Sequence, residues 1–398
     1  MNKKLSQSTA SYFPVIILFF GIIFLSSCAK INEWCQLQEG IYLAKAGNYK
    51  EAIPAFTKAI ELDPKDGRAY WGRGIAYDFL GDYNQAIKDL NLAVELNPKD
   101  AGIYAARGNI YGKHGDYVQA IKDFNKALEL NPKLIRAYWG RGAAHDFLGD
   151  YNQAIKDLSV AVELDPKNAG IYSARGVIYH RHGDNDQAIK DFNKALELNP
   201  KFATAYSGRG MVYDYLGDSD QAIRDFSKAI ELNAKDAFAY RGRGIAYYQI
   251  MNYKQALQDF DKAIECKPGD EYNYLRSVIA AEYLSKETRT ARLEQLSRHE
   301  KEYPSDAWVR SLSLYYLNRL SENQLLTMAK QGKDIKDVKG RLCEAYYYVG
   351  ELKLFNKERK IALDYFTKTV STGVDNFIEY KMAKAAIKSN KAGADSHH

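Results

Sequence analysis

The stretch GRAYWGRGIAYDFLGDYNQAIKDLNLAVELNPKD, residues 67–100, decides the fold of this 398-residue chain. Its periodic residues are Tyr70, Gly74, Tyr77, Ala86, Leu90 and Ala93. In each half they recur at i, i+4 and i+7, which puts them on one face of a helix. The turn between the halves contains Asp82 three residues before Gln85, and this spacing predicts a capping box at the start of a second helix. The stretch therefore predicts a helix–turn–helix unit that ends near Pro98.

The same pattern recurs every 34 residues from residue 33 to residue 270. The seven copies are 33–66, 67–100, 101–134, 135–168, 169–202, 203–236 and 237–270. Period and residue pattern resemble the tetratricopeptide repeat, abbreviated TPR. The resemblance implies an all-α fold, a right-handed superhelical TPR solenoid. Because one helix pair cannot bury its apolar face alone, we expect stability to come from stacking between neighbouring repeats.

The sequence becomes less regular after residue 270, where an array of repeats needs a cap. Residues 271–342 read as degenerate helical repeats, and residues 343–376 as one more TPR-like unit with Gly350 and Phe366 in the expected places. A capping helix is predicted at 377–390. The remaining residues, 391–398, are predicted to be disordered.

An arginine precedes the signature glycine in repeats two to seven, and an aspartate follows it sixteen residues later. The pairs are Arg73/Asp89, Arg107/Asp123, Arg141/Asp157, Arg175/Asp191, Arg209/Asp225 and Arg243/Asp259. In repeat one both members are replaced together, by Glu39 and Ala55. This joint replacement favours structural ion pairs within one repeat. A functional basic ladder is the alternative interpretation.

A second stripe on the first helix of each repeat points away from the packed face. In proteins of this type that stripe lines a concave groove, and exposed Trp, Phe and Arg side chains there are typical of binding hot spots. The predicted protein-binding residues of the groove are Arg68, Trp71, Asp78, Phe79, Lys113, Arg136, Trp139, Asp146, Phe147, Arg181, Tyr215 and Arg241. The alternative is that these aromatic side chains pack against the next repeat.

Residues 67–134 and 135–202 differ at 14 of 68 positions, which indicates an internal duplication. Five of the differences fall on groove positions: Ile75/Ala143, Ala105/Ser173, Asn109/Val177, Gly112/His180 and Lys113/Arg181. This excess suggests that change has concentrated where a ligand would touch the groove.

The first 28 residues are typical of a bacterial lipoprotein leader. Lys3 and Lys4 precede the apolar run VIILFFGIIFL at 15–25, which is shorter than the roughly 20 residues of a membrane-spanning helix. The run leads into Leu25-Ser26-Ser27-Cys28, which resembles a lipobox. We expect residues 1–27 to be a signal peptide, Cys28 to be lipidated, for example with palmitate, and 28–32 to be a short linker. An ordinary cleavage site beside an incidental cysteine is the alternative.

Several classes of function lack their sequence signals. The formal net charge of +6 is dispersed along the chain, which argues against nucleic acid binding. There is no nucleophile elbow, phosphate-binding loop, dinucleotide loop or metal motif, so we expect neither an enzyme nor a bound cofactor or metal. Besides Cys28, the cysteines Cys35, Cys266 and Cys343 are odd in number and widely spaced, and they predict no disulfide framework.

The segment YYYVGELKLFNKERKIALDYFTKTVSTGVDNFIEY, residues 346–380, resembles bacterial TPR lipoproteins of the new-lipoprotein-I type. The similarity covers about residues 200–390 and the lipobox. It implies an outer-membrane lipoprotein facing the periplasm, possibly a homodimer, that brings a periplasmic protease to cell-wall hydrolases. The function expected from it is a non-catalytic adaptor whose groove binds protein segments. The more regular repeats of this chain depart from that family and leave the partners open.

Two other functions fit the same residues. One is a pilotin-like lipoprotein that helps to assemble an outer-membrane secretin or pilus complex. The other is a structural homo-oligomer whose groove is filled by its own tail or by a second copy. Binding of a small molecule is the weakest alternative, because the stripe is open and extended rather than an enclosed pocket.

Overall fold

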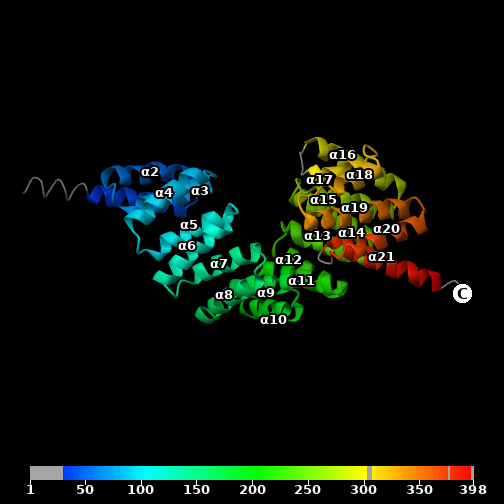
Figure 1. Ribbon diagram of the computed structural model, residues 1–398, viewed down its shortest axis with the longest axis horizontal. Helices are drawn as coiled ribbons and strands as arrows, with labels where there is room; N and C mark the ends of the chain where they lie inside the picture. The colour runs from blue at the N-terminus through cyan, green and yellow to red at the C-terminus, as the bar shows by residue number, and fades with distance from the viewer. Residues whose placement is uncertain (1–29, 303–306, 375–376, 396–398) are drawn as a thin grey trace, which may run out of the picture. The chain divides into compact units, whose positions relative to one another are not determined.

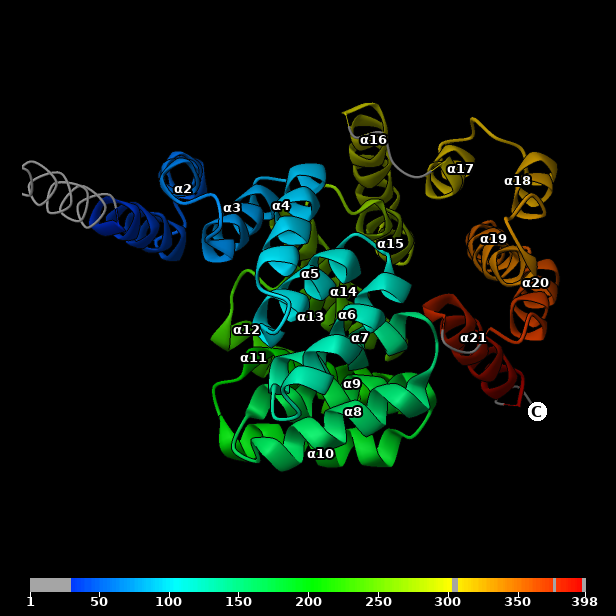
Figure 2. The same cartoon turned by 60° about the vertical axis from the view of Figure 1, so that its left-hand side comes forward.

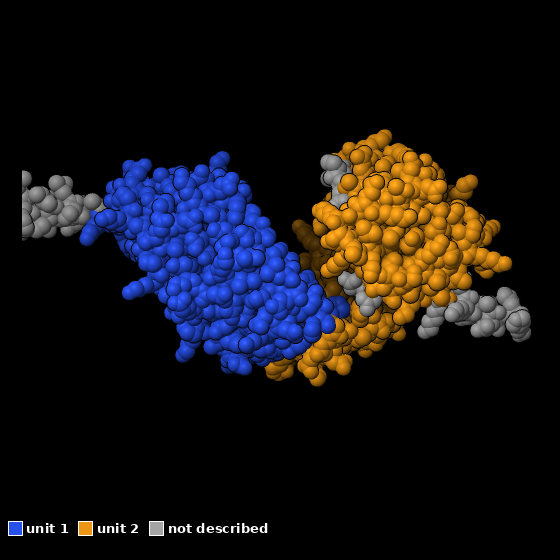
Figure 3. Space-filling model, viewed as in Figure 1, with its two compact units in different colours: residues 1–182 blue, residues 183–398 orange. Residues whose placement is uncertain are grey.

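The computed structural model describes residues 30–302, 307–374 and 377–395. Every regular element in these ranges is a helix, which confirms the predicted all-α fold. The chain divides into two compact units, unit 1 at residues 1–182 and unit 2 at residues 183–398 (Figure 3). The predicted signal peptide, lipobox and Cys28 lie outside the described residues. None of the described helices is both long enough and apolar enough to cross a bilayer.

Unit 1 is a run of helix–turn–helix pairs (Figure 1). Its first helix covers residues 30–45, and the others are α2 (Tyr49–Leu62), α3 (Gly67–Phe79), α4 (Tyr83–Leu96), α5 (Ala101–Lys113), α6 (Tyr117–Leu130), α7 (Ile135–Phe147), α8 (Tyr151–Leu164) and α9 (Ala169–His182). Each helix packs on its neighbour along the chain. The pairs follow the 34-residue period of the sequence.

Caps at the turns explain where the helices begin and end. The Asp82 carboxylate accepts a hydrogen bond from the backbone N–H of Gln85 at 3.1 Å, which satisfies one free donor at the start of α4. Equivalent aspartates cap the second helix of the next four repeats. The reciprocal half of the predicted capping box is not recorded at these turns; the full box occurs at Ser321 and Gln324, before α18. Gly81, at φ +85°, ends α3 in a conformation that favours glycine.

Small residues let successive helices approach closely. A Cβ on Gly72 would lie 2.4 Å from the ring of Phe56, which is itself 1% exposed in the core of the first repeat. A Cβ on Gly74 would lie 3.1 Å from the backbone oxygen of Ala86 and from Leu90. The signature glycines and alanines are therefore packing requirements, as the sequence predicts.

The arginine–aspartate pairs form within a repeat, as predicted. Both carboxylate oxygens accept from the guanidinium, at 2.6–2.9 Å, in five pairs: Arg73–Asp89, Arg107–Asp123, Arg141–Asp157, Arg209–Asp225 and Arg243–Asp259. The sixth pair, Arg175 and Asp191, has its members in different units and stays a prediction. The remaining guanidinium nitrogen reaches back to the preceding repeat, for example from Arg107 to Asn91 at 2.7 Å. The arginine therefore ties two repeats together.

Unit 2 continues with the same kind of helix pairs and then departs from them. Its helices are α10 (Asn185–Leu198), α11 (Ala203–Leu216), α12 (Ser219–Leu232), α13 (Ala237–Gln249), α14 (Tyr253–Cys266), α15 (Glu271–Glu282), α16 (Lys286–Glu302), α17 (Ala307–Tyr316), α18 (Glu322–Ala329), α19 (Ile335–Phe355), α20 (Arg359–Ser371) and α21 (Ile378–Asp395). From α15 to α21 each helix contacts the next, and they follow one another around an arc (Figure 2).

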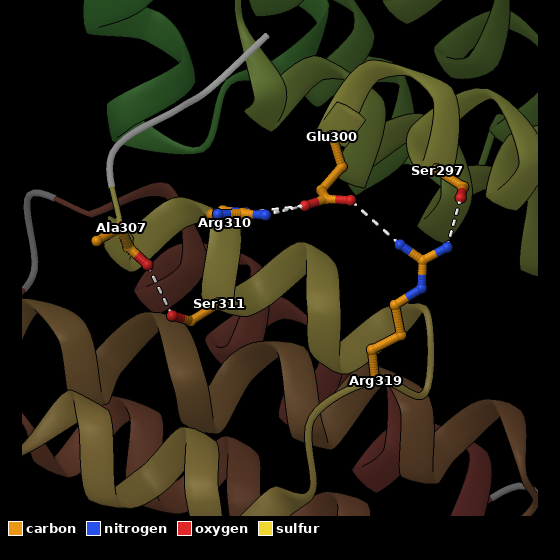
Figure 4. A network of polar contacts seen from close by, with 6 residues as sticks. All are labelled: Ser297, Glu300, Ala307, Arg310, Ser311 and Arg319. Atoms are coloured by element: carbon orange, nitrogen blue, oxygen red, sulfur yellow. Dashed lines mark hydrogen bonds and ion pairs between the residues drawn. The ribbon is translucent and has the colours of Figure 1, made fainter. Parts of the chain in front are cut away.

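Buried polar contacts close this arc. The carboxylate of Glu351 on α19 accepts from the hydroxyls of Tyr248 on α13, at 3.0 Å, and of Tyr283, at 2.9 Å. Arg276 on α15 pairs with Glu379 on α21 at 3.3 Å. The buried Glu300 of α16 accepts from Arg310 and Arg319, at 2.6 and 3.1 Å (Figure 4). These ties hold the irregular C-terminal helices in one unit.

The C-terminal elements follow the expectations with one difference. A Cβ on Gly350 would lie 2.7 Å from the Phe366 ring, so α19 and α20 pack like a regular pair. Helix α21 continues to Asp395, and residues 391–395 are therefore helical where the sequence predicts a disordered tail. The stretch contains alanine and lysine, which favour continuation of a helix. The last three residues lie outside the described part.

Candidate protein-binding groove

A groove-shaped cavity of about 700 Å³ lies on unit 1, between its first helix and helices α3, α5 and α7. Its lining residues are Ile41, Ala44, Lys45, Tyr49, Arg68, Trp71, Gly72, Ile75, Asp78, Phe79, Ala106, Asn109, Ile110, Lys113 and Arg136. Six of the twelve predicted groove residues are among them, namely Arg68, Trp71, Asp78, Phe79, Lys113 and Arg136. The predicted stripe of this region therefore faces one open cavity.

Trp71 forms part of the cavity wall and also touches the core. It packs against the buried cluster around Leu90 and Ile103. Its indole ring lies 3.4 Å from the position that a Cβ on Gly102 would take, so the glycine makes room for the ring. Both interpretations of this tryptophan thus apply: one part of the ring packs on the next repeat, and another part lines the cavity.

Phe79 stacks on Tyr49 and remains exposed. The two ring centroids are 4.2 Å apart, the planes differ by 2°, and Phe79 is 59% exposed. Lys113 lies above the same phenyl ring, with its Nζ 5.8 Å from the centroid. The contact with the preceding repeat orients Phe79, while its exposed area stays available for an apolar side chain of a partner.

The charges of the cavity are mostly basic. Asp78 is 7% exposed, and its carboxylate pairs with Lys113 at 3.0 Å and contacts His114 at 3.3 Å. Arg68 forms a bidentate pair with Asp66, and hydrogen bonds from Arg68 help to hold the pKa of that carboxyl below its ordinary value, against the opposing effect of burial. Arg136 is exposed and has no ion-pair partner among the described residues. Arg136 is therefore the cation best placed to receive an acidic group.

Trp139 and Phe147 repeat this arrangement one duplication further along. Phe147 stacks on Tyr117 with centroids 4.8 Å apart and planes differing by 5°. The Trp139 ring lies 3.0 Å from where a Cβ on Gly170 would be, and Trp139 is 38% exposed. Arg181 pairs with Asp146, whose pKa burial raises above its ordinary value. The two bands of unit 1 share the aromatic stack and the acid–base pair.

The last two predicted groove residues lie in unit 2 and contact other parts of the same unit. The Nζ of Lys381, on α21, is 4.2 Å from the centroid of the Tyr215 ring. Arg241 pairs with Asp270 at 3.0 Å, and desolvation lowers the pKa of its guanidinium. Tyr215 thus meets the chain's own C-terminal helix, and its role in partner binding stays a prediction.

The sequence analysis missed the residues that the first repeat contributes to the cavity. Ile41, Ala44 and Lys45 come from the first helix, and Tyr49 begins α2. A signal for them exists, because Ile41, Ala44 and Lys45 stand 34 residues before Ile75, Asp78 and Phe79. Applying the period to repeat one would have found them. The stacking partner Tyr49 has no such signal on the stripe itself.

Neither metal nor thiol chemistry finds a site in the described ranges. No group of His, Cys, Asp or Glu side chains there could hold a metal ion. Cys35 is exposed, Cys266 is partly buried and Cys343 is buried, and none of these three is in a disulfide. Burial raises the pKa of the Cys343 thiol to about 12, so this thiol stays protonated and unreactive at neutral pH.

Sequence comparison agrees with the repeat pattern. Profiles described as tetratricopeptide repeat match residues 37–101 and residues 101–134, 169–202, 203–236 and 237–270, and a further TPR profile matches residues 148–183. Together the matches cover more than half of the chain. The chain belongs to the tetratricopeptide-repeat proteins, a family whose arrays serve as protein-interaction scaffolds. No curated protein matches it in sequence.

Solved structures show the same fold. A tetratricopeptide repeat protein from Parabacteroides merdae superposes with a TM-score of 0.54 at 20% identity, over 63% of this chain and 98% of that one. Cut9 in the anaphase-promoting complex heterotetramer Cut9–Hcn1 gives 0.50 at 19% identity, over 71% of this chain and 55% of that one. MamA is 29% identical over 41% of this chain and 96% of its own, with a TM-score of 0.38.

Proposed function

We propose that the protein is a membrane-anchored, non-catalytic adaptor that binds a segment of a partner protein in the groove of unit 1. The observation that supports this most is one cavity in which exposed aromatic side chains, Trp71 and Phe79, stand beside basic ones, Lys113 and Arg136. Aromatic and arginine side chains supply most of the binding energy in protein interfaces. The cavity opens along several helices, which suits an extended segment.

The chemistry of the cavity favours a segment that combines apolar and acidic residues. Its basic lining residues are Lys45, Arg68, Lys113 and Arg136, against a single acidic one, Asp78. An apolar side chain would pack on Phe79 and Trp71, while a carboxylate would pair with Arg136. Charge complementarity of this kind steers association and selects partners. A basic segment would meet repulsion here.

The anchoring part of the proposal depends on Cys28. Acyl chains on this cysteine would hold the array at a membrane surface, which the resemblance in residues 346–380 suggests is the outer membrane. Each buried CH₂ of an acyl chain contributes about 0.8 kcal/mol. Confinement to one surface raises the effective concentration of bound partners without new chemistry. We propose a periplasmic protease and peptidoglycan hydrolases as these partners.

A pull-down from solubilised envelope tests the groove. The bait is the mature chain without its lipid, compared with the double variant Trp71→Ala/Trp139→Ala. A matched control is Leu80→Ala/Leu148→Ala, because these leucines are also exposed, at 50% and 51%, and do not line the cavity. Bound proteins are identified by mass spectrometry, and Kd values are then measured with each purified partner.

We expect the wild type and the leucine control to enrich the same partners and the tryptophan variant to lose them. Recovery of the same partners by all three baits would place binding outside the groove. Selective recovery of secretin or pilus subunits, rather than proteases or hydrolases, would replace the proposed partners with a pilotin-like role.

One contact favours a second candidate, a self-occupied groove in unit 2. Lys381 of α21 covers Tyr215, and the buried Glu379 of the same helix pairs with Arg276. If α21 blocks a binding surface, its removal from Ile378 onward should increase partner binding. Unchanged or lower binding after removal would leave α21 a purely structural helix.

A further inference from the structure

The first helix, residues 30–45, exposes apolar side chains on its outer side. Ile31 is 62% exposed, Trp34 is 55% exposed and Tyr42 is 72% exposed. At 100° per residue these three fall within about one quarter of the helix circumference, together with Cys35 and Gln38, which are also exposed. We name these five residues the N-terminal face. The opposite side of the helix packs into the first repeat through Leu37 and Ile41.

In the later repeats the equivalent surface is buried. Cys35, Gln38 and Tyr42 stand 34 residues before Ala69, Gly72 and Ala76. The two alanines are 0% exposed, and a Cβ on Gly72 would collide with Phe56 of the preceding repeat. A tyrosine could not take the place of Ala76 against a stacked repeat. The N-terminal face is thus the end of the array, and its residues differ from those that pack on another repeat.

The ends of a repeat array normally carry a polar outer surface. Here the end carries isoleucine, tryptophan and tyrosine, with Lys30 and Lys45 and the acidic Glu39 exposed beside them. Tryptophan and tyrosine are the side chains enriched where a bilayer meets water, because an apolar ring is joined to a polar atom. Lysines at the edge of such a face are attracted to anionic lipid.

The position of this face in the sequence indicates what covers it. Cys28, the predicted lipid attachment site, stands only two residues before Lys30, the first described residue of the helix. Two residues span at most about 7 Å when extended. Acyl chains on Cys28 would therefore hold the beginning of this helix at the lipid headgroups. A protein partner would have to fit between the helix and the bilayer.

We propose that the N-terminal face lies on the membrane interface, with Ile31, Trp34 and Tyr42 inserted among the lipid headgroups. This inference rests on the proposed anchoring at Cys28. Ile41, Ala44 and Lys45 line the groove from the same helix, and a helix is about 10–12 Å across. The groove then begins about one helix diameter above the bilayer, where it can receive partner segments that lie close to the membrane.

Binding to vesicles without the lipid anchor tests the face by itself. The protein is the mature chain with Cys28→Ser, and the vesicles contain phosphatidylethanolamine and phosphatidylglycerol in equal parts. The test variant is Trp34→Gln/Tyr42→Gln, and the control is Val118→Gln, an exposed apolar residue of α6 (55%) outside the face. Co-sedimentation gives the partition coefficient, and thermal unfolding verifies that each variant is folded.

We expect the double variant to lower the partition coefficient about tenfold, the change that 1.4 kcal/mol produces, and the control to leave it unchanged. Equal partitioning of all three proteins, or no partitioning of any, would overturn the proposal. Sedimentation velocity adds a second readout. If the double variant dissociates a dimer while vesicle binding stays the same, the face joins two copies of the chain instead.

The mass of the native chain separates this inference from the anchoring proposal. An unmodified Cys28 in the native protein would refute the lipid anchor, whatever the vesicles show. A lipidated Cys28 together with vesicle binding that does not depend on Trp34 and Tyr42 would leave the anchor in place and refute the interfacial face.

Discussion

Arg107 binds both carboxylate oxygens of Asp123 at 2.7 Å, and the two side chains are only 17% and 9% exposed. The same guanidinium donates to Asn91 of the preceding repeat. One side chain thus joins the two helices of its own repeat and the boundary with its neighbour. A structural role of this kind differs from that of Arg136, which has no acidic partner among the described residues.

Replacing Arg107 should destabilise the array. Arg107→Ala leaves the Asp123 carboxylate buried without its cation, and losing one member of a buried pair costs about 3 kcal/mol or more. The measurement is the urea denaturation midpoint. Lys126→Ala is the control, because Lys126 pairs with Glu129 at the surface and such pairs contribute less than about 1 kcal/mol. Equal effects of the two variants would refute the structural role.

Replacing Arg136 should weaken partner binding and leave the fold intact. Arg136→Ala removes an exposed cation of the cavity, so we expect an affinity loss that shrinks as salt is added, because ions screen exposed charges. Calorimetric titration with the partner found by pull-down gives Kd at low and high salt. Arg136→Lys should recover part of the affinity. A lower thermal stability of Arg136→Ala would show instead that Arg136 supports the packing.

Two glycines should respond to the same substitution in opposite directions. In Gly140→Ala the new Cβ would lie 2.4 Å from the Phe124 ring, and overpacking of this kind typically costs 1–3 kcal/mol. In Gly112→Ala the nearest contact is 3.8 Å, so the higher helix propensity of alanine should stabilise α5 by about 0.5–1 kcal/mol. Denaturation midpoints that shift in the same direction would contradict this packing.

Unit 2 should lose stability as pH rises above neutral. Burial raises the pKa of Glu282 to about 8, with the nearby Glu351 raising it further and Arg289 opposing. The folded state therefore holds a proton that the unfolded state releases above its ordinary pKa of about 4.3. This contribution is complete below that value and falls until pH passes about 8. Burial also raises the pKa of Asp214, to about 6, which adds a loss at lower pH.

Glu282→Gln tests the assignment, because glutamine is neutral at every pH. We expect the thermal midpoint of the variant to decline less between pH 6 and pH 8.5 than that of the wild type, where the decline reflects the ionisation of Glu282. Glu287→Gln, on an exposed residue of α16, serves as the control. Identical pH profiles of wild type and Glu282→Gln would refute the raised pKa.

The regular part of the fold was predictable because every interaction that makes it recurs within about one period of the sequence. The helix pairs, the caps at Asp82 and its equivalents, and the arginine–aspartate pairs join residues only a few to sixteen positions apart. Alternation of large and small residues states these contacts directly. The capping box at Ser321 and the continuation of α21 to Asp395 were missed because they fall in the irregular segment.

The candidate groove was predictable only in part. The period assigns Trp71, Phe79 and Arg136 to one stripe, but it does not state which aromatic rings stack or which cations are already paired. Tyr49 under Phe79 and Asp66 on Arg68 are seen only once the helices are placed beside one another. Those contacts decide that Arg68 is partly neutralised and that Arg136 is not.

The sequence by itself therefore determined an all-α array of stacked helix pairs, because its local periodicity leaves each pair with an apolar face that only a neighbour can cover. Tertiary structure alone decided what lies on the surfaces of that array. Lys381 reaches Tyr215, and Glu351 receives the hydroxyl of Tyr248, across more than one hundred residues of sequence. Such contacts depend on how the helices wind through space, and no repeat period encodes that winding.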